Sequence, residues 1–272
     1  MSSKDAERTG AGVGRRRVLH TAAAAAGGVL LGGAIDLAAA GEALAGARPR
    51  VYNRGDWNAR KPKSWAVVRS APPDRIVVHH TATGNGSGRS KDHAFRLSKA
   101  IQDYHMDSNG WSDIGQQLTI SRGGHVMEGR NRSLKAIGED DHVVGAHTAS
   151  HNEHTIGIES EGSYMSATPP PELLTALVET CAWLCLAYGL DPAKAIAGHR
   201  DFNPTSCPGD KLYGMLPGLR SDVRSRLHTL QARLALRDGS VPDEHLPTYP
   251  EVPSAERRAP FHHGPAVGSQ ES

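Results

Sequence analysis

The sequence predicts a single α/β domain between residues 48 and 237. Short apolar stretches of strand length alternate there with longer stretches of helical periodicity, a pattern typical of α/β domains. The whole chain has 272 residues, of which 38% are hydrophobic and 22% charged, a composition that excludes a multi-span membrane protein. Because 31 Lys and Arg stand against 29 Asp and Glu, the charge does not favour nucleic acid as a partner.

Strands are expected where short stretches are rich in β-branched and other apolar side chains. They are predicted at residues 75–79, 113–121, 125–128, 155–161 and 196–198. A Gly-Gly pair at 123–124 separates the second strand from the third, which indicates a hairpin. In the fourth strand, Ile156 and Ile158 share one face. Glu159 and Glu161 share the other.

Helices are expected where apolar residues recur at helical spacing. The first covers residues 90–106, and Ser90 is suited to cap its N-terminus. The second follows a run of prolines at 169–171 and extends to Tyr188. The third is a final amphipathic helix, marked by Leu219, Val223, Leu227, Leu230 and Leu234.

The first 47 residues have the pattern of an export signal. Arginines at 15–17 precede a mildly apolar run rich in Ala and Gly, and small residues at 43–45 suit a signal peptidase. Paired arginines before apolar residues resemble the twin-arginine class, so we expect a protein exported to the cell envelope or secreted. The alternative is a membrane anchor, which Asp36 and the many small residues disfavour. No stable membrane span is therefore expected once the signal is removed.

Residues 238–272 have the composition of a flexible tail. Six of the 17 prolines lie between Pro242 and Pro265, among Ser, Glu and Gly with few apolar residues. Such a stretch buries too little apolar surface to offset the entropy of ordering it. We therefore predict a proline-rich disordered tail, in which His262 and His263 are solvated.

The cysteines and histidines point to a metal site. The chain contains 15 His, the commonest metal ligand, and only three Cys. Cys181 and Cys185 lie one turn apart on the apolar face of a predicted helix, so both are expected to be buried hydrophobic residues. Cys207 instead follows His199 in a polar loop, where metal ligation is favoured for the thiol of an exported protein.

A zinc centre would need one more ligand than this loop supplies. Zinc accepts nitrogen and sulfur donors, and a catalytic zinc keeps three protein ligands and one open position. His199 and Cys207 could supply two of them. The third is expected from the pair at 79–80, which ends an apolar strand that could open onto a cleft.

Six short motifs occur in order along the chain. They are His79-His80-Thr81-Ala82-Thr83, Tyr104-His105-Met106 with Gly110 to Gly115, Glu128-Gly129-Arg130, Val144 to Thr148, Thr155 to Ile158, and Gly198 to Asp201 with Cys207-Pro208-Gly209. Together they resemble the peptidoglycan recognition protein and type-2 N-acetylmuramoyl-L-alanine amidase family over about residues 52–222. The resemblance implies a single mixed central β-sheet flanked by helices, with a groove for the glycan-peptide strand.

The resemblance also implies a reaction and a metal. The reaction is zinc-dependent hydrolysis of the amide bond between the lactyl group of N-acetylmuramic acid and L-Ala of the stem peptide. The zinc ligands would be His79, His199 and Cys207. Non-catalytic members lack one or more of these ligands, commonly the cysteine, whereas all three are present here.

Two positions differ from the catalytic phage and animal members. Those members carry Tyr where this chain has Gln116, and glutamine cannot act as an acid or a base. Glu159 stands where they have an uncharged residue, and it resembles the catalytic Glu of related recycling amidases. Because a carboxylate beside zinc can take a proton from water and pass it to the leaving amine, we assign Glu159 as general base and then acid. The alternative for Glu159 is a solvated carboxylate at a strand end.

Other family positions concern the oxyanion and the substrate. Thr205 matches a hydroxyl or lysine position that supports the tetrahedral oxyanion. Gly110, Trp111 and Arg130 match positions associated with diaminopimelate-type stems, and Arg130 could pair with the diaminopimelate carboxylate. Trp111 could instead be a half-buried core aromatic. His147 is predicted at the groove, with packing or a hydrogen bond to a metal ligand as its alternative.

The expected partner is peptidoglycan, as a muropeptide, and the expected state is a monomer.

Two other functions compete with the amidase. A recognition protein that binds peptidoglycan without cutting it is favoured by Gln116 and disfavoured by the complete ligand set with Glu159. A cysteine hydrolase that uses Cys207 and His199 is disfavoured by Pro208 directly after the thiol. It is also disfavoured because no helix N-terminus is expected there to lower the thiol pKa.

Overall fold

The computed structural model describes residues 48–237, and its centre is a six-stranded β-sheet. In spatial order the strands are β1 (Val51–Tyr52), β5 (Val126–Glu128), β4 (Leu118–Ile120), β7 (Thr155–Ser160), β3 (Arg75–His80) and β8 (Ile196–Gly198). The predicted export signal at 1–47 and the predicted tail at 238–272 lie outside the described residues.

The sheet is mixed, as the resemblance implied. Strands β4, β7, β3 and β8 run parallel to one another, and β1 runs parallel to β5. Strands β4 and β5 pair antiparallel across the turn at 123–124, so the predicted hairpin is confirmed. Because parallel strands need long crossover connections, helices cover both faces of the sheet.

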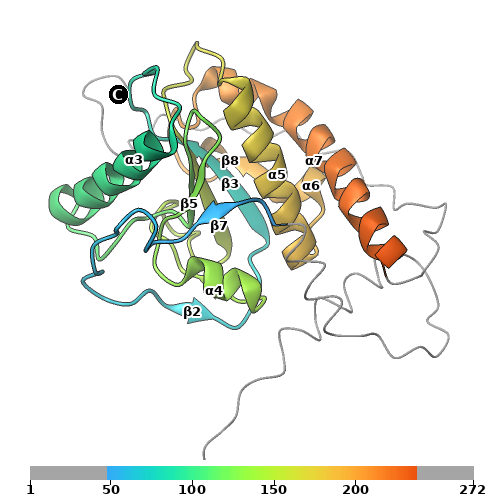
Figure 1. Cartoon of the computed structure of the whole chain (residues 1–272), viewed down its shortest axis with the longest axis horizontal. Helices are drawn as coiled ribbons and strands as arrows, with labels where there is room; N and C mark the ends of the chain where they lie inside the picture. Colours follow the sequence, from blue (N-terminus) through green and yellow to red (C-terminus); the bar gives the residue numbers. More distant parts are fainter. Residues whose placement is uncertain (1–47, 238–272) are drawn as a thin grey trace, which may run out of the picture.

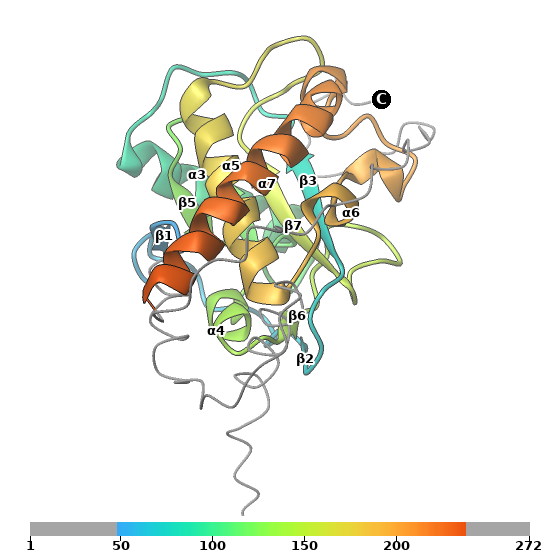
Figure 2. The same ribbon diagram turned by 90° about the vertical axis from the view of Figure 1, so that its right-hand side faces the viewer.

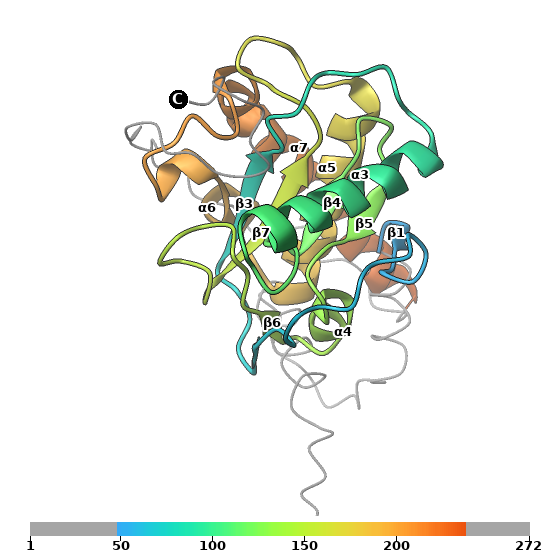
Figure 3. The same ribbon diagram turned by 90° about the vertical axis from the view of Figure 1, so that its left-hand side faces the viewer.

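The longer helices are divided between the two faces of the sheet (Figure 1). Helices α5 (Pro171–Tyr188) and α7 (Asp210–Arg237) lie side by side in front of the sheet in Figure 2. Helix α3 (Lys91–Asp103) covers the opposite face, which Figure 3 shows. A π-helical turn, η1 (Tyr104–Ser108), continues α3 toward the site region.

Strand alternation gives the two faces different side chains. Val78 of β3 and Ile158 of β7 are fully buried in the core with α5 and α7. Each fully buried side chain of this size contributes about 1.5–3 kcal/mol to folding. His79 and Glu159, the next residue on each strand, lie on the opposite face. The apolar face therefore anchors the sheet and leaves polar side chains on the α3 side.

The helix termini follow local sequence rules. Ser90 accepts a hydrogen bond from the backbone N–H of His93, so the predicted cap of α3 is confirmed. Pro171 occupies the first position of α5, where its missing N–H costs no hydrogen bond. Gly189 ends α5 with φ +63°, a left-handed conformation that favours glycine, and its N–H bonds to the Cys185 carbonyl. Cys181 and Cys185 are buried in the core, as expected.

Several short elements were not predicted. They are β1 (Val51–Tyr52), β2 (Val68–Arg69) paired antiparallel with β6 (His142–Val143), helices α4 (Ser133–Gly138) and α6 (Pro192–Ala195), and the 3-10 turn η2 (His199–Asp201). Each is too short to show a repeating hydrophobic pattern. Among the described residues, no helix is both long and apolar enough to cross a membrane.

The strand predicted at 113–121 begins only at Leu118, so the first part of that prediction is wrong. The side chain of Gln117 replaces a backbone strand partner there. Its Oε1 accepts from the Gly157 N–H at 2.7 Å, and its Nε2 donates to the Val143 carbonyl at 2.7 Å. The backbone of 113–117 therefore runs as a loop between the sheet and the β6 region.

Candidate metal and active site

The carboxyl ends of three parallel strands bring the predicted site residues together. His79 lies near the end of β3, Glu159 lies near the end of β7, and His199 directly follows β8. In α/β sheets, ligand sites form beyond the carboxyl ends of parallel strands. Because β3 lies between β7 and β8, His79 is the central residue of the group.

The loop from 199 to 207 folds back so that Cys207 reaches β3. The Arg200 N–H bonds to the Cys207 carbonyl at 3.1 Å and closes the loop. The Cys207 N–H donates to Thr205 Oγ1 at 3.1 Å, and the His80 N–H donates to Cys207 Sγ at 3.4 Å. Cys207 Sγ is thereby held against the end of β3.

Three potential ligand atoms meet at this point. One ligand atom from each of His79, His199 and Cys207 lies within 4.8 Å of the others, and all three residues are buried. Within residues 48–237 this is the one group of three or more His, Cys, Asp or Glu with metal-binding geometry. Two imidazoles and one thiol form a donor set that suits zinc.

His147 determines which nitrogen of His79 faces the cysteine. His147 Nε2 lies 3.3 Å from the Thr155 carbonyl, which can only accept, so this nitrogen carries the proton. Burial lowers the pKa of His147 to about 3, so the ring is neutral and its Nδ1 accepts from His79 Nε2 at 3.1 Å. The unprotonated Nδ1 of His79 then faces Cys207 Sγ at 3.6 Å.

Asn203 orients His199 in the same way. Its Oδ1 accepts from His199 Nε2 at 3.0 Å, which leaves Nδ1 as the unprotonated nitrogen. Burial lowers the pKa of His199 to about 4, so the ring is in the neutral form that binds metal ions. Asn203 was not among the predicted site residues, although it lies in the same polar loop as His199.

His147 itself lies behind the ligand group. It is 1% exposed, and its ring nitrogens contact His79, Thr148 and Thr155. The ring also packs on the backbone of β7, because a Cβ at Gly157 would lie 2.7 Å from His147 Cγ. Its position therefore suits orientation of His79, the alternative named above, more than direct contact with substrate.

Glu159 is the register partner of His79. Directly paired residues of neighbouring strands point to the same face, so the two side chains share the α3 side of the sheet. On the other side of Glu159, β4 presents Thr119, whose hydroxyl accepts from Gln116 Nε2 at 2.9 Å. Gln116 therefore reaches the strand next to Glu159, and all these side chains are buried.

Glu161, the other carboxylate on that face, is engaged differently. Its Oε1 lies 2.6 Å from His93 Nε2, and its Oε2 accepts from the Arg122 N–H at 2.7 Å. These contacts tie β7 to α3 and to the loop after β4. The carboxylate of Glu161 therefore stabilises the packing of these segments, and Glu159 is the carboxylate next to the ligand group.

The expectation that no helix N-terminus lies near Cys207 is wrong. Helix α7 begins at Asp210, so a helix N-terminus does lie close to this thiol along the chain. Cys207 is nevertheless buried and contacts His79 and His80. These neighbours place the sulfur inside the ligand group, not on an exposed surface.

The predicted substrate residues Trp111 and Arg130 lie on two neighbouring segments, which follow η1 and β5. Trp111 is partly buried, and its ring packs against the His105 ring with centroids 4.6 Å apart. Arg130 is also partly buried, and its Nη1 donates to the Ile114 carbonyl at 2.9 Å. The Arg130 backbone N–H donates to the Gln116 carbonyl at 2.9 Å. The segment around Arg130 therefore runs beside the segment around Gln116, which leads into β4.

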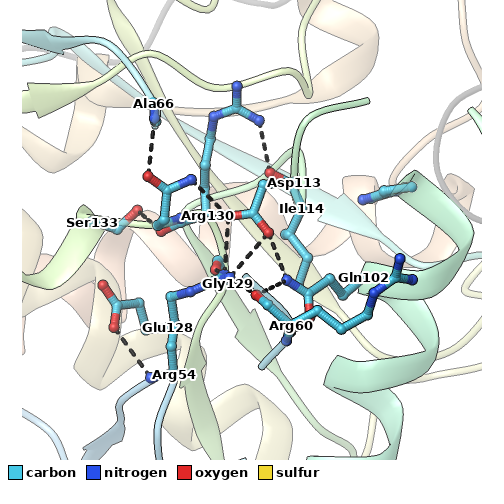
Figure 4. A network of polar contacts seen from close by, with 12 residues as sticks. Arg54, Arg60, Ala66, Gln102, Asp113, Ile114, Glu128, Gly129, Arg130 and Ser133 are labelled. Atoms are coloured by element: carbon cyan, nitrogen blue, oxygen red, sulfur yellow. Dashed lines mark hydrogen bonds and ion pairs between the residues drawn. The ribbon is translucent and has the colours of Figure 1, made fainter. Parts of the chain in front are cut away.

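A buried carboxylate holds these segments together (Figure 4). Asp113 is fully buried and accepts from Gln102 Nε2 at 2.7 Å and from Asn131 Nδ2 at 2.8 Å. Arg54 Nη1 completes the charge pair with Asp113 at 3.1 Å. Asp113 thus joins α3, the loop at 54–60 and the segment next to Arg130.

We expect Asp113→Ala to lower the free energy of unfolding by about 3–5 kcal/mol, because it leaves the buried amides of Gln102 and Asn131 without this acceptor and the partly buried guanidinium of Arg54 without its charge partner. Urea denaturation followed by circular dichroism measures this loss. Asp107→Ala is the control, since this exposed residue pairs with Arg60 at the surface and should change stability little. Equal losses in the two variants would contradict a special role for Asp113.

Comparison with known proteins agrees with this arrangement. The sequence pattern of the family described as N-acetylmuramoyl-L-alanine amidase matches residues 69–210. Peptidoglycan-recognition protein LB of Drosophila melanogaster is 30% identical over 167 residues, which cover 61% of this chain and 67% of that protein. An N-acetylmuramoyl-L-alanine amidase of Homo sapiens is 31% identical over 182 residues, which cover 65% of this chain but 30% of the human protein.

Solved structures agree as well. Wild-type Drosophila PGRP-LB superposes with a TM-score of 0.53 at 30% identity, over 61% of this chain and 92% of that one. Peptidoglycan recognition protein LE, solved with tracheal cytotoxin (a monomeric diaminopimelic acid-type peptidoglycan), superposes with a TM-score of 0.54 at 27% identity, over 62% of this chain and 92% of that one. The chain therefore belongs to the family of N-acetylmuramoyl-L-alanine amidases and peptidoglycan recognition proteins.

Proposed function

We propose that this protein is a zinc-dependent amidase that hydrolyses the bond between the lactyl group of N-acetylmuramic acid and L-Ala of the stem peptide. One observation carries the proposal: His79, His199 and Cys207 converge with both imidazoles oriented to present Nδ1. A protein that only recognises peptidoglycan has no need of such an oriented donor set.

The donor set fits zinc in number, type and protonation. Two neutral imidazoles and one thiol match the three protein ligands of a catalytic zinc. The hydrogen bonds from His79 to His147 and from His199 to Asn203 are of the kind that orients histidine ligands in zinc proteins. When bound, zinc would polarise the scissile carbonyl and make a water molecule easier to deprotonate.

Glu159 would handle the proton in this reaction. Its carboxylate takes the proton of the attacking water and then delivers it to the amide nitrogen of L-Ala as the C–N bond breaks. The register pairing with His79 supports this role, because it places the carboxyl group beside the ligand group. The Thr205 hydroxyl accepts from the Cys207 N–H, so its own proton remains for donation to the developing oxyanion.

The proposed substrate is a peptidoglycan fragment with a diaminopimelate-type stem. Arg130 would bind the diaminopimelate carboxylate, with Gly110 and Trp111 lining the same end of the groove. The solved relative with a bound diaminopimelic acid-type fragment supports this substrate class. The proposal includes export by the twin-arginine pathway through residues 1–47 and action as a monomer in the cell envelope or outside the cell.

Peptidoglycan recognition without cleavage is the second candidate. Gln116 favours it, because its amide donates to Thr119 next to Glu159 and offers no titratable group. The two candidates make different predictions for the same assay.

The test is cleavage of a diaminopimelate-type muropeptide by the purified full-length protein, with mass spectrometry of the released stem peptide. We expect cleavage to stop on chelation and to return when one equivalent of zinc is added. Binding without cleavage under all conditions would support the recognition protein and overturn the amidase. Cleavage that resists the chelator and is lost on thiol alkylation would instead support a cysteine hydrolase.

A further inference from the structure

A second group of histidines lies outside the site described above, in the connection between β6 and β7. His151 Nδ1 and His154 Nε2 lie 3.2 Å apart. His154 Nδ1 lies 2.7 Å from Asp74 Oδ1, and Asp74 precedes β3. The family motifs quoted from the sequence include neither histidine.

The Asp74 carboxylate contacts the ring nitrogen of His154 that faces away from His151. Asp74 Oδ1 accepts from His154 Nδ1, so a neutral His154 presents a lone pair on Nε2. This Nε2 faces His151 Nδ1 across the gap between the two rings. A metal ion in this gap would be bound by these two nitrogens.

The distance between the rings suits one metal ion. Two nitrogen ligands at 2.0–2.1 Å from a tetrahedral ion lie about 3.3 Å apart. The two nitrogens are 3.2 Å apart, so their separation already matches that of two ligands of one ion. A carboxylate on the other nitrogen of a ligating histidine is the usual outer partner in zinc proteins, and Asp74 occupies that place.

The two histidines and Asp74 are accessible to solvent, and a neighbouring arginine offsets part of the negative charge of Asp74. The side chains of His154 and Asp74 are 42% and 60% exposed, so an ion can enter and keep water in its remaining positions. Arg75 Nη1 lies 3.8 Å from the other oxygen of Asp74 and offsets part of its charge. Imidazole donors of this kind select Zn²⁺, Ni²⁺ or Cu²⁺ over Mg²⁺ and Ca²⁺.

We propose that His151 and His154 form an accessory site for a divalent transition metal, with Asp74 orienting His154. The site is separate from the His79, His199 and Cys207 group and does not depend on the amidase proposal. Its ion would brace the β6–β7 connection against the loop that carries His199. The His151 ring packs on Phe202 with centroids 5.1 Å apart, and Asn203 Nδ2 donates to the Ala149 carbonyl at 3.2 Å.

The test is the metal stoichiometry of the untagged full-length protein after equilibrium dialysis against micromolar Zn²⁺, measured by atomic emission. We expect two equivalents in the wild type and one in the His151→Gln/His154→Gln variant. The control, His262→Gln/His263→Gln, removes the paired histidines of the C-terminal segment and should keep two equivalents. Cys207→Ser should lose the other equivalent and keep the accessory one.

Cobalt gives a second readout that does not depend on counting. A Co²⁺ ion in the Cys207 group has a thiolate charge-transfer band in the near ultraviolet, whereas an ion held by two imidazoles has none. We expect titration of the wild type to show one phase with this band and one without it, and the double histidine variant to lack the second phase. Equal metal contents in the wild type and in His151→Gln/His154→Gln would overturn the proposal, whatever the occupancy of the Cys207 group.

Discussion

Replacing Glu159 by glutamine is expected to lower kcat for muropeptide cleavage by about 10²- to 10⁴-fold, the usual contribution of a general acid–base group. Glutamine keeps the size and hydrogen-bonding capacity of the side chain but cannot take a proton from water. Because Glu159 pairs with His79 in the sheet and is not one of the three ligands, the variant should keep the zinc content of the wild type. Steady-state kinetics together with metal analysis measures both properties.

Glu172→Gln is the matched control for this variant. Glu172 is exposed in the first turn of α5, so its substitution removes the same charge and should leave kcat unchanged. Circular dichroism establishes that both variants are folded. If Glu159→Gln retains wild-type kcat with its zinc in place, the assigned role of Glu159 is refuted, while the metal site remains.

Replacing Cys207 by serine is expected to abolish zinc binding at the His79, His199 and Cys207 group, a loss of one equivalent, and to reduce cleavage to the level of the chelated protein. A serine hydroxyl stays protonated near neutral pH and is a poor ligand, whereas a thiol loses its proton on binding metal. The side chains differ by one atom, so the buried loop from 199 to 207 should keep its fold. Zinc content after dialysis and the rate of muropeptide cleavage are the two measurements.

Cys181→Ala is the control for the loss of a thiol. Cys181 is buried on α5 in the apolar core, and burial raises the pKa of its thiol, so it is not expected to bind metal. This variant should lose some stability but keep its zinc and its activity. Full zinc content in Cys207→Ser would show that the sulfur is not a ligand, and it would remove the main support for the proposed metal centre.

Local sequence signals predicted the elements that build the scaffold. Ser90 marked the start of α3, and the prolines before position 171 marked the start of α5. The alternation in β7 correctly separated Ile158 from Glu159. These features depend on residues close together in the chain, so a single sequence reveals them.

The segment before β4 shows where local signals mislead. Its residues were predicted to continue the strand from position 113, yet Gln117 bonds through its side chain to Gly157 and Val143. Asp113 similarly accepts from Arg54, which is far away in the sequence. Such a side chain forms hydrogen bonds with a segment that is distant in the sequence. These bonds do not alter the hydrophobic pattern of the residues around it, so the pattern does not reveal them.

The sequence by itself determined which donors this protein offers: two histidines in separate motifs, a cysteine in a polar loop and a carboxylate on a strand. It did not determine which nitrogen each histidine presents or which carboxylate stands beside the ligands. The tertiary structure decided both, through the Thr155 carbonyl behind His147, the amide of Asn203 and the pairing of β3 with β7. The physical reason is that protonation and orientation depend on neighbours in space, whereas residue type is a property of the chain alone.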